Sequence, residues 1–245
     1  MKRYLKIENL PFAVLGCSLL AFLMRLWLFA LGEDDRGLLA SGSFPDVMSW
    51  LLVAVTIALL GFACHKLGGL NKYSQNFSAS PIAALGMALA AVGFVISSVT
   101  DLSAQLDSIG LISALLGFLA ALCLLLLAWA RFQGQHLSIL FHGVVCMFLM
   151  LYLVSHYRLW SSFPQLQSYA FELMAIVFVM LACYQRAAFD AGKGNRRIYA
   201  FCTYAAVFFC ITTLPGCDNI SFFLGSAVWM FCTPCRLTLY TPKEN

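Results

Sequence analysis

The chain has 245 residues, of which 62% are hydrophobic and 11% are charged. Soluble domains are roughly 45–50% apolar and about 25% charged, so a water-soluble fold of this length could not cover its own apolar surface. The formal net charge of +4 comes from basic residues dispersed between apolar blocks, which excludes a nucleic-acid-binding surface. We therefore expect an integral membrane protein whose principal partner is the lipid bilayer.

The first apolar block runs from Leu10 to Leu31 and follows a short basic stretch, Met1 to Lys6. It is too long for the apolar region of a signal peptide, which spans about 7–15 residues, and no small-residue cleavage site ends it. We therefore expect this block to be a retained transmembrane helix.

Eight apolar segments follow one another along the chain, most of them close to the roughly 20 residues that a helix needs to cross hydrocarbon. They are residues 10–31, 47–65, 81–100, 109–130, 137–155, 166–185, 198–214 and 219–238. The seventh is short and ends at Pro215-Gly216, so a seven-helix arrangement is the alternative. The connections are too short for a soluble domain, and the sequence predicts one all-α transmembrane bundle over residues 1–245.

Lysine and arginine are distributed unequally between the connections. With the N-terminus inside, the inner segments hold Lys2, Arg3, Lys6, Lys66, Lys72, Arg131, Arg186, Lys193, Arg196, Arg197, Arg236 and Lys243. The outer connections hold only Arg36 and Arg158. Because short, positively charged loops stay on the cytoplasmic side, this bias predicts that both termini are cytoplasmic, in a cell membrane of the bacterial inner-membrane type.

An internal repeat is suggested by short matches at one fixed offset. Ser43-Phe44-Pro45 opens the second segment, and Ser162-Phe163-Pro164 opens the sixth. At the same offset, Ala63-Cys64 is matched by Ala182-Cys183. These matches favour a duplicated four-helix unit with halves 1–130 and 131–245, which would be a parallel repeat because each unit has an even number of helices. Chance matching between apolar segments is the alternative.

Two ionisable residues fall within predicted spans, Arg25 in the first and Glu172 in the sixth. A charge in hydrocarbon is costly unless it is paired or hydrated, so such residues are candidates for function. Their predicted depths below the outer surface are similar, which favours an ion pair that joins the two halves. The functional interpretation is a polar site near the outer entrance, with Asp46 beside it. Asp46 has a second interpretation, as a cap of the second helix.

Five cysteines are expected toward the cytoplasmic side: Cys64, Cys183, Cys202, Cys232 and Cys235. Cys232 and Cys235 have the C-x-x-C spacing found in thiol redox sites and in metal sites. A single such motif in an apolar chain is weak support, since free cysteine behaves as a small hydrophobic residue in protein cores. The sequence therefore leaves a metal or redox site and simple packing as alternatives, and the cofactor stays open.

Glycine recurs at a spacing of seven residues on two neighbouring segments, as Gly86 and Gly93 and then as Gly110 and Gly117. Small residues on one face let helix backbones approach closely. This pattern predicts a tight pair between the third and fourth helices. The four histidines, His65, His136, His142 and His156, are interpreted as interface or capping residues.

The sequence leaves three classes of function open. The chain carries no phosphate-binding glycine loop, zinc-protease motif or nucleophile elbow, which favours a protein that is not an enzyme. The first hypothesis is a small-solute or ion transporter with a polar site near Arg25 and Glu172. The alternatives are a redox or metal-binding membrane protein using Cys232 and Cys235, and a non-catalytic partner or sensor subunit bound to a second copy or to another membrane protein.

Overall fold

The structure, a computed structural model, describes residues 9–31, 42–67, 76–77, 79–103, 108–135, 137–161 and 169–233. Its elements are helices: α1 (Leu10–Ala30), α2 (Phe44–His65), α4 (Pro81–Ser103), α5 (Ser108–Gln133), α6 (Ile139–Trp160), α7 (Ala170–Asp190), α8 (Arg196–Thr213) and α9 (Ile220–Cys232). This confirms the predicted all-α bundle. The seven-helix alternative is wrong, because α8 and α9 are separate helices.

Short polar residues set several of the helix starts. Ser138 and Asn195 are the N-caps of α6 and α8, and their side chains accept hydrogen bonds from the N–H groups of Leu140 at 3.4 Å and Arg197 at 3.0 Å. These bonds satisfy N–H groups that the first helical turn leaves without a backbone partner. Proline stands in the first turn of α1 and α2, where its missing N–H costs nothing.

Four helix boundaries differ from the prediction by four residues or more. α6 ends at Trp160 rather than near 155, and α7 ends at Asp190 rather than near 185. α7 begins at Ala170 rather than near 166, so Glu172 lies in the first turn of the helix. α9 ends at Cys232 rather than near 238. Thr233 precedes a proline, and the residue before a proline disfavours the helical conformation, which accounts for this end.

Six of the helices, α1, α2, α4, α5, α6 and α7, are long and apolar enough to cross a membrane, which is the composition of a multi-pass membrane protein. The other two do not reach these limits. α8 opens with Arg196 and Arg197, and α9 has only 13 residues. Both are largely buried among the longer helices.

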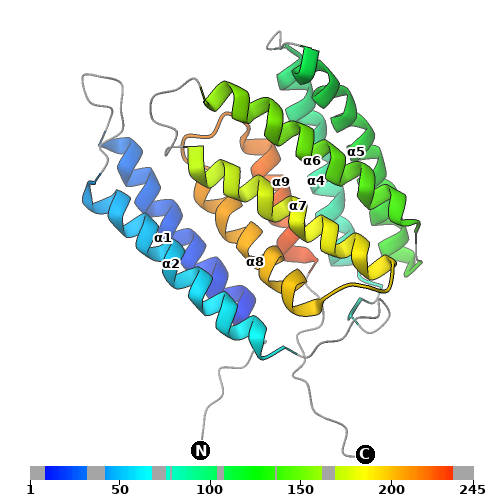
Figure 1. The fold of residues 1–245 in the computed structure, drawn as a ribbon, viewed down its shortest axis with the longest axis horizontal. Coiled ribbons are helices and arrows are strands. Elements are labelled where there is room, and N and C mark those ends of the chain that lie inside the picture. Colours follow the sequence, from blue (N-terminus) through cyan, green and yellow to red (C-terminus); the bar gives the residue numbers. More distant parts are fainter. Residues whose placement is uncertain are drawn as a thin grey trace, which may run out of the picture.

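The helices α4 to α9 pack as a closed ring, in which each helix contacts the next and α9 returns to α4. The pair α1–α2 lies outside this ring and packs on α8 (Figure 1). Successive helices run in alternating directions. We call the end where α1 begins and α9 ends the lower end, as in Figure 1, and the opposite end the upper end.

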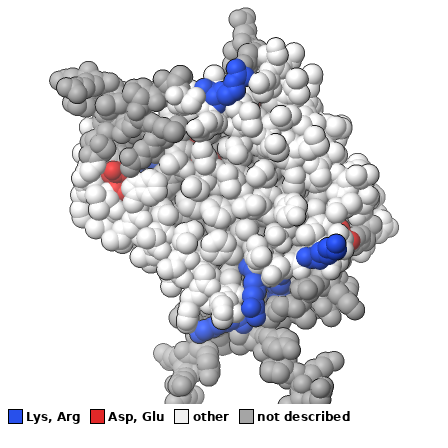
Figure 2. Space-filling model, viewed as in Figure 1, with Lys and Arg blue, Asp and Glu red and all other residues white. Residues whose placement is uncertain are grey.

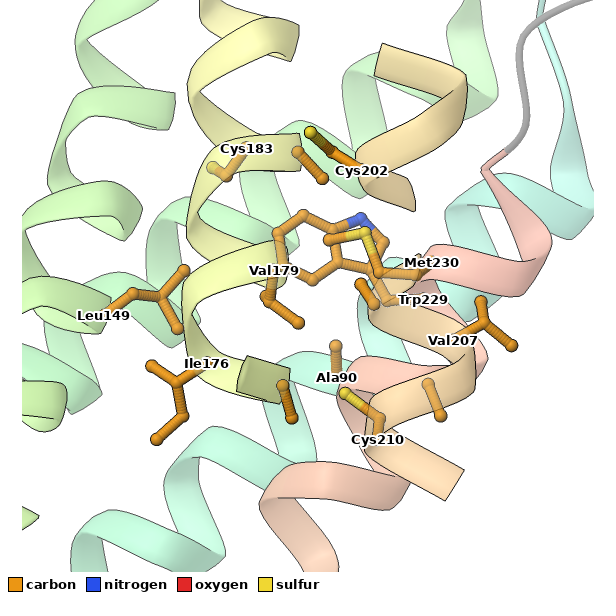
Figure 3. Close-up of a cluster of buried hydrophobic side chains, with 14 of the residues drawn as sticks. Ala90, Leu149, Ile176, Val179, Cys183, Cys202, Val207, Cys210, Trp229 and Met230 are labelled. Atoms are coloured by element: carbon orange, nitrogen blue, oxygen red, sulfur yellow. The ribbon is translucent and has the colours of Figure 1, made fainter. Parts of the chain in front are cut away.

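Aromatic side chains occupy the interior of the ring. The ring of Phe94 on α4 stacks on Phe222 of α9, with 5.1 Å between centroids, and Phe222 stacks in turn on Tyr152 of α6 at 4.4 Å. Below them, aliphatic side chains of α6 and α7 face α8 and α9 around Trp229 and Met230 (Figure 3). An apolar layer therefore separates the polar groups of the upper end from those of the lower end.

The glycines of α4 serve a different contact from the predicted one. A Cβ atom on Gly86 would lie 2.7 Å from Cβ of Cys232, and one on Gly93 would collide with the backbone oxygen of Ser221. Both neighbours belong to α9, so these glycines allow the close approach of α4 and α9. Gly117 of α5 does face α4, since its Cβ would collide with the hydroxyl of Ser98. The predicted tight pair of α4 and α5 is therefore present with Gly117 at its contact, but the part assigned to Gly86 and Gly93 is wrong, because these two glycines face α9.

Charged residues separate between the two ends among the described residues. The lower end holds Lys66, Arg131, Arg186, Lys193, Arg196 and Arg197, with Asp190 as the acid. The upper end holds Asp46, Asp101, Glu172 and Asp218, with Arg25 and Arg158 as the bases. Figure 2 shows most of the lysine and arginine surface of this face toward the lower end. The cytoplasmic location of that end stays a prediction from the positive-inside rule.

The duplication of a four-helix unit also stays a prediction. In the second half, α7 packs along α8. The corresponding helices of the first half are α2 and α4, and α2 packs instead on α1 and α8. Any duplication would therefore have to be followed by rearrangement of the first half.

Candidate functional site

The side chain of Asn219 joins three helices at the upper end of the ring. Its amide nitrogen Nδ2 donates to the hydroxyl of Tyr152 on α6 at 2.9 Å and to Oδ1 of Asp101 on α4 at 3.3 Å. Its Oδ1 accepts from the hydroxyl of Thr100 at 3.1 Å. Asn219 is the N-cap of α9, so this network fixes the upper end of α9 against α4 and α6.

His156 completes this network from α6. Its Nε2 lies 3.8 Å from Oδ1 of Asp101, and its Nδ1 lies 3.0 Å from the backbone oxygen of Tyr152. The imidazole stacks on the Tyr152 ring, with 4.0 Å between centroids. An acid, an imidazole, a phenol and an amide are thus in direct contact within apolar helices. Such a set can bind polar groups or pass protons between its members.

Arg25 is buried where α1 meets the ring. Only 3% of its surface is exposed, and its guanidinium carbon lies 4.3 Å from the centroid of Phe171 on α7 and 5.3 Å from that of Phe29. The face of an aromatic ring carries partial negative charge, which stabilises a cation placed over it. Arg25 therefore extends from the outer α1–α2 pair to the first turn of α7.

Glu172, the residue after Phe171, is 5% exposed and interacts electrostatically with Arg25 and with Asp218. Asp218 in turn interacts with His156. The loop between α8 and α9, which carries Cys217, Asp218 and Asn219, thus connects the Arg25 region with the Asn219 network. We call these residues together the upper polar site: Arg25, Asp101, Tyr152, His156, Glu172, Asp218 and Asn219.

The structure places the predicted polar residues as follows. Arg25 and Glu172 lie close enough to interact, and whether they form a functional pair stays a prediction. Asp46 also interacts with Arg25, and its Oδ2 accepts a hydrogen bond from the N–H of Gly42 at 2.9 Å. Ser43 is the N-cap of α2, so Asp46 stabilises the turn that precedes the helix.

The loop cysteine Cys217 borders the same site. Its Sγ donates to the backbone oxygen of Leu214 at 3.4 Å, and 8% of the residue is exposed. Burial raises the pKa of this thiol to about 12, and the negative charge of Glu172 contributes to the shift. The thiol is therefore protonated near neutral pH and acts as a packing and hydrogen-bonding group.

The cysteines proposed for metal or redox chemistry are spread over several helices. Cys64 lies on α2, Cys183 on α7, Cys202 on α8 and Cys232 at the end of α9, and Cys235 lies outside the described residues. Within the described residues, no group of three or more histidine, cysteine, aspartate or glutamate side chains could hold a metal ion. Cys232 packs against Gly86, and Cys183 donates to the backbone oxygen of His142 at 3.6 Å. Packing contacts account for these two residues.

Sequence reasoning missed most of the upper polar site. No role was predicted for Asp101 or Asn219, and His156 was interpreted as an interface or capping residue. The structure buries Asp101 and Asn219 between helices, with the partly buried His156 beside them. One signal was available for the histidines. His142 and His156 are separated by almost four helical turns, so they project from the same side of α6. Each one faces an aspartate of a neighbouring helix, Asp190 at 3.1 Å for His142 and Asp101 for His156.

Comparison of this chain with protein-family models, with curated proteins and with solved structures finds no match. The functional argument therefore rests on the geometry of the upper polar site and on the class of fold that carries it. That class is a helical bundle with the composition of a multi-pass membrane protein.

Proposed function

We propose that this protein is a permease-type transporter and that the upper polar site binds its solute. The observation that carries the proposal is the burial of Arg25, Glu172 and Asp101 in a bundle of apolar helices. Asp218, an exposed loop residue, interacts electrostatically with both Glu172 and His156 and so links the two parts of the site. Apolar packing alone would stabilise such a bundle. Buried charges are costly in this setting, so their presence favours a role in binding or in moving a solute or ion.

The position of the site between two packed units supports this function. Arg25 comes from the outer α1–α2 pair, whereas Phe171, Glu172 and the α8–α9 loop belong to the ring. Transporters commonly alternate access by moving one group of helices against another around a site at their interface. Such a movement would open the site at the interface between the α1–α2 pair and the ring. The apolar layer below the site would keep it closed toward the lower end.

The charges of the site favour a small solute that carries an amino group. Four acidic residues act electrostatically on the site: Glu172 and Asp46 on Arg25, and Asp101 and Asp218 on His156. A protonated amine would be attracted to these groups. Arg25 would add a contact for a carboxylate on the same solute, since a guanidinium group binds carboxylates with two parallel hydrogen bonds.

Access to Glu172 tests the proposal. In intact cells or oriented vesicles, Glu172→Cys should react with a membrane-impermeant thiol reagent, measured on the peptide by mass spectrometry. Ile176→Cys is the matched control, because it lies one turn further along α7 with 0% exposure and should not react. A mixture of amino acids should protect Glu172→Cys from the reagent. If the reagent fails to label Glu172→Cys from either side of the membrane, the site has no water-filled access and the transporter proposal is wrong.

A further inference from the structure

The hydrogen-bond partners of His156 fix which of its ring nitrogens can take up a proton. Nδ1 lies 3.0 Å from the backbone oxygen of Tyr152, and a carbonyl oxygen only accepts hydrogen bonds, so Nδ1 carries a hydrogen. The lone pair of the neutral ring is therefore on Nε2, which lies 3.5 Å from Nδ2 of Asn219 and 3.8 Å from Oδ1 of Asp101. A proton that binds this ring arrives between an amide and a carboxylate.

The amide of Asn219 has fewer hydrogens than there are acceptor atoms around it. Its two N–H bonds face the hydroxyl oxygen of Tyr152 at 2.9 Å, Oδ1 of Asp101 at 3.3 Å and Nε2 of His156 at 3.5 Å. A proton on Nε2 adds a third hydrogen, which the carboxylate can accept. The separation of 3.8 Å between Nε2 and Oδ1 is longer than a hydrogen bond, so the ring and the carboxylate approach one another when the proton binds.

Water at the upper end has a short path to this pair. The side chains of His156 and Asp101 are 13% and 12% exposed, and they lie in the last two turns of α6 and α4. The second histidine–aspartate pair, His142 with Asp190 at the lower end, has side chains that are only 3% and 4% exposed. Because the apolar layer lies between the two pairs, the upper pair exchanges protons with the upper side of the bundle.

Acids and bases of several elements act on the His156 ring or on its neighbours. Asp101 and the exposed Asp218 attract a proton to the ring, whereas partial burial opposes the charge that the proton brings. Opposed contributions of this kind allow an imidazole to take up and release a proton. The described titratable residues of α5, Cys123 and Arg131, lie in the lower half of that helix. Further charged or titratable side chains of the upper end come from α1, α2, α6, α7 and the α8–α9 loop: Arg25, Asp46, Tyr152, Tyr157, Arg158, Tyr169, Glu172 and Cys217.

We propose that His156 and Asp101 together bind the proton that this transporter couples to solute movement. The inference rests on the proposed function and names its coupling ion. In the binding step a hydronium ion transfers its proton to the lone pair of Nε2 and leaves as water. The ring changes from neutral to singly positive, and no electron is transferred. Nε2 then donates to Asp101 and no longer accepts from Asn219, and release of the proton to water reverses the step.

Asn219 connects this proton to the solute site. It is the N-cap of α9 and follows Asp218, which acts electrostatically on Glu172. When Nε2 of His156 becomes a donor, the amide of Asn219 loses one of its contacts. The α8–α9 loop and the charge of Asp218 can then shift relative to Glu172. Uptake of the proton and access to the solute site are linked in this way.

Nitrogen NMR of the purified full-length protein with isotope-labelled histidine measures the proton binding directly. The signals of His156 are identified by their loss in His156→Gln. In the wild-type protein Nε2 should become protonated as the pH falls, while Nδ1 stays protonated throughout. Asp101→Asn should move the midpoint of this titration by about one pH unit, because it removes the adjacent charge. Asp190→Asn is the matched control, since it removes the aspartate beside His142 and should leave the midpoint unchanged.

Access to Glu172→Cys tests the coupling to transport. Its rate of labelling by the impermeant thiol reagent is measured across the titration of His156, with the native histidine and in His156→Gln. The pH dependence of the thiol reaction is common to both proteins, so it cancels in the ratio of the two rates. This ratio should change severalfold across the titration. In His65→Gln, which replaces an exposed histidine at the lower end, the corresponding ratio should stay constant. Asp101→Asn replaces His156→Gln as the test variant if the latter does not fold.

The two measurements separate the proton proposal from the proposed function. A His156 ring that does not titrate while the protein stays folded, or a midpoint that Asp101→Asn leaves in place, overturns the proton-binding pair. Labelling of Glu172→Cys at a ratio that stays constant retains the transporter and overturns the coupling. Absence of labelling at every pH removes the transporter and the coupling with it, even where His156 titrates.

Discussion

The amide nitrogen of Asn219 lies 2.9 Å from the hydroxyl oxygen of Tyr152, and this contact joins α9 to α6 across the upper end of the ring of helices. Tyr152 is 1% exposed and its ring stacks on Phe222, so the phenol belongs to both the aromatic interior and the polar site. Asn219 stands at the start of α9 and also contacts α4. The first helical turn of α9 is therefore tied to α4 and α6 by one side chain.

Replacing Asn219 by leucine should destabilise the protein by about 1–3 kcal/mol. The substitution removes the amide partner of Tyr152, Asp101 and Thr100, and buried polar groups that lose a hydrogen-bond partner cost about this much free energy. The measurement is the midpoint of thermal unfolding in detergent. Ser103→Ala is the control, because the Ser103 hydroxyl is exposed and bonds only to carbonyls of its own helix. An equal shift in the two variants would argue against the network.

Alanine at Gly93 should weaken the contact between α4 and α9. The added Cβ would collide with the backbone oxygen of Ser221, and a backbone atom cannot turn away as a side chain does. Overpacking of this kind costs about 1–3 kcal/mol. Gly61→Ala on α2 provides the matched control, since no atom lies within 4 Å of its new Cβ. Thermal unfolding of the two variants checks this, and a Gly93→Ala protein as stable as Gly61→Ala would mean that α4 and α9 are less closely packed.

The helices could be predicted from the sequence because apolar runs of sufficient length have few alternatives in hydrocarbon. Their neighbours could not be predicted in the same way. The glycines of α4 were assigned to α5, the next helix in the chain, but closure of the ring brings α9 against the same face. Hydropathy records which residues avoid water and carries no information on which helix covers them.

The polar site was predictable only in part, for a related reason. Arg25 and Glu172 were found because a charge inside an apolar run is visible in the sequence alone. Asp101 and Asn219 lie at the ends of apolar runs, where polar residues are ordinary. Their contact depends on the meeting of α4 and α9, which a single sequence does not reveal.

Arg25 and Glu172 should show energetic coupling. Arg25→Met removes the opposite charge that acts on Glu172, and a buried carboxyl in that setting takes up a proton, so the single change should cost about 1–3 kcal/mol. In Arg25→Met/Glu172→Gln both charges are absent, and the double variant should be at least about 1 kcal/mol more stable than the sum of the single effects. Unfolding in detergent measures all three variants.

The control for this cycle pairs Arg25→Met with Asp190→Asn at the opposite end of the bundle, where the effects should add. Additive effects in the Arg25–Glu172 cycle as well would show that the two side chains are independent. The predicted ion pair between them would then be wrong, although each residue could still contribute separately to the upper polar site.

The thiol of Cys217 should react slowly with iodoacetamide at neutral pH in the folded protein. Alkylation requires the thiolate, and burial raises the pKa of this thiol to about 12. The rate at the Cys217 peptide should therefore rise about tenfold for each pH unit between pH 7 and 10, as the thiolate fraction does. In protein unfolded with dodecyl sulfate, the rate should level off above the ordinary thiol pKa of about 8.5. Peptide-resolved mass spectrometry follows both states, and a folded-state rate that levels off below pH 9 would show that Cys217 is exposed to solvent and does not line the polar site as a neutral thiol.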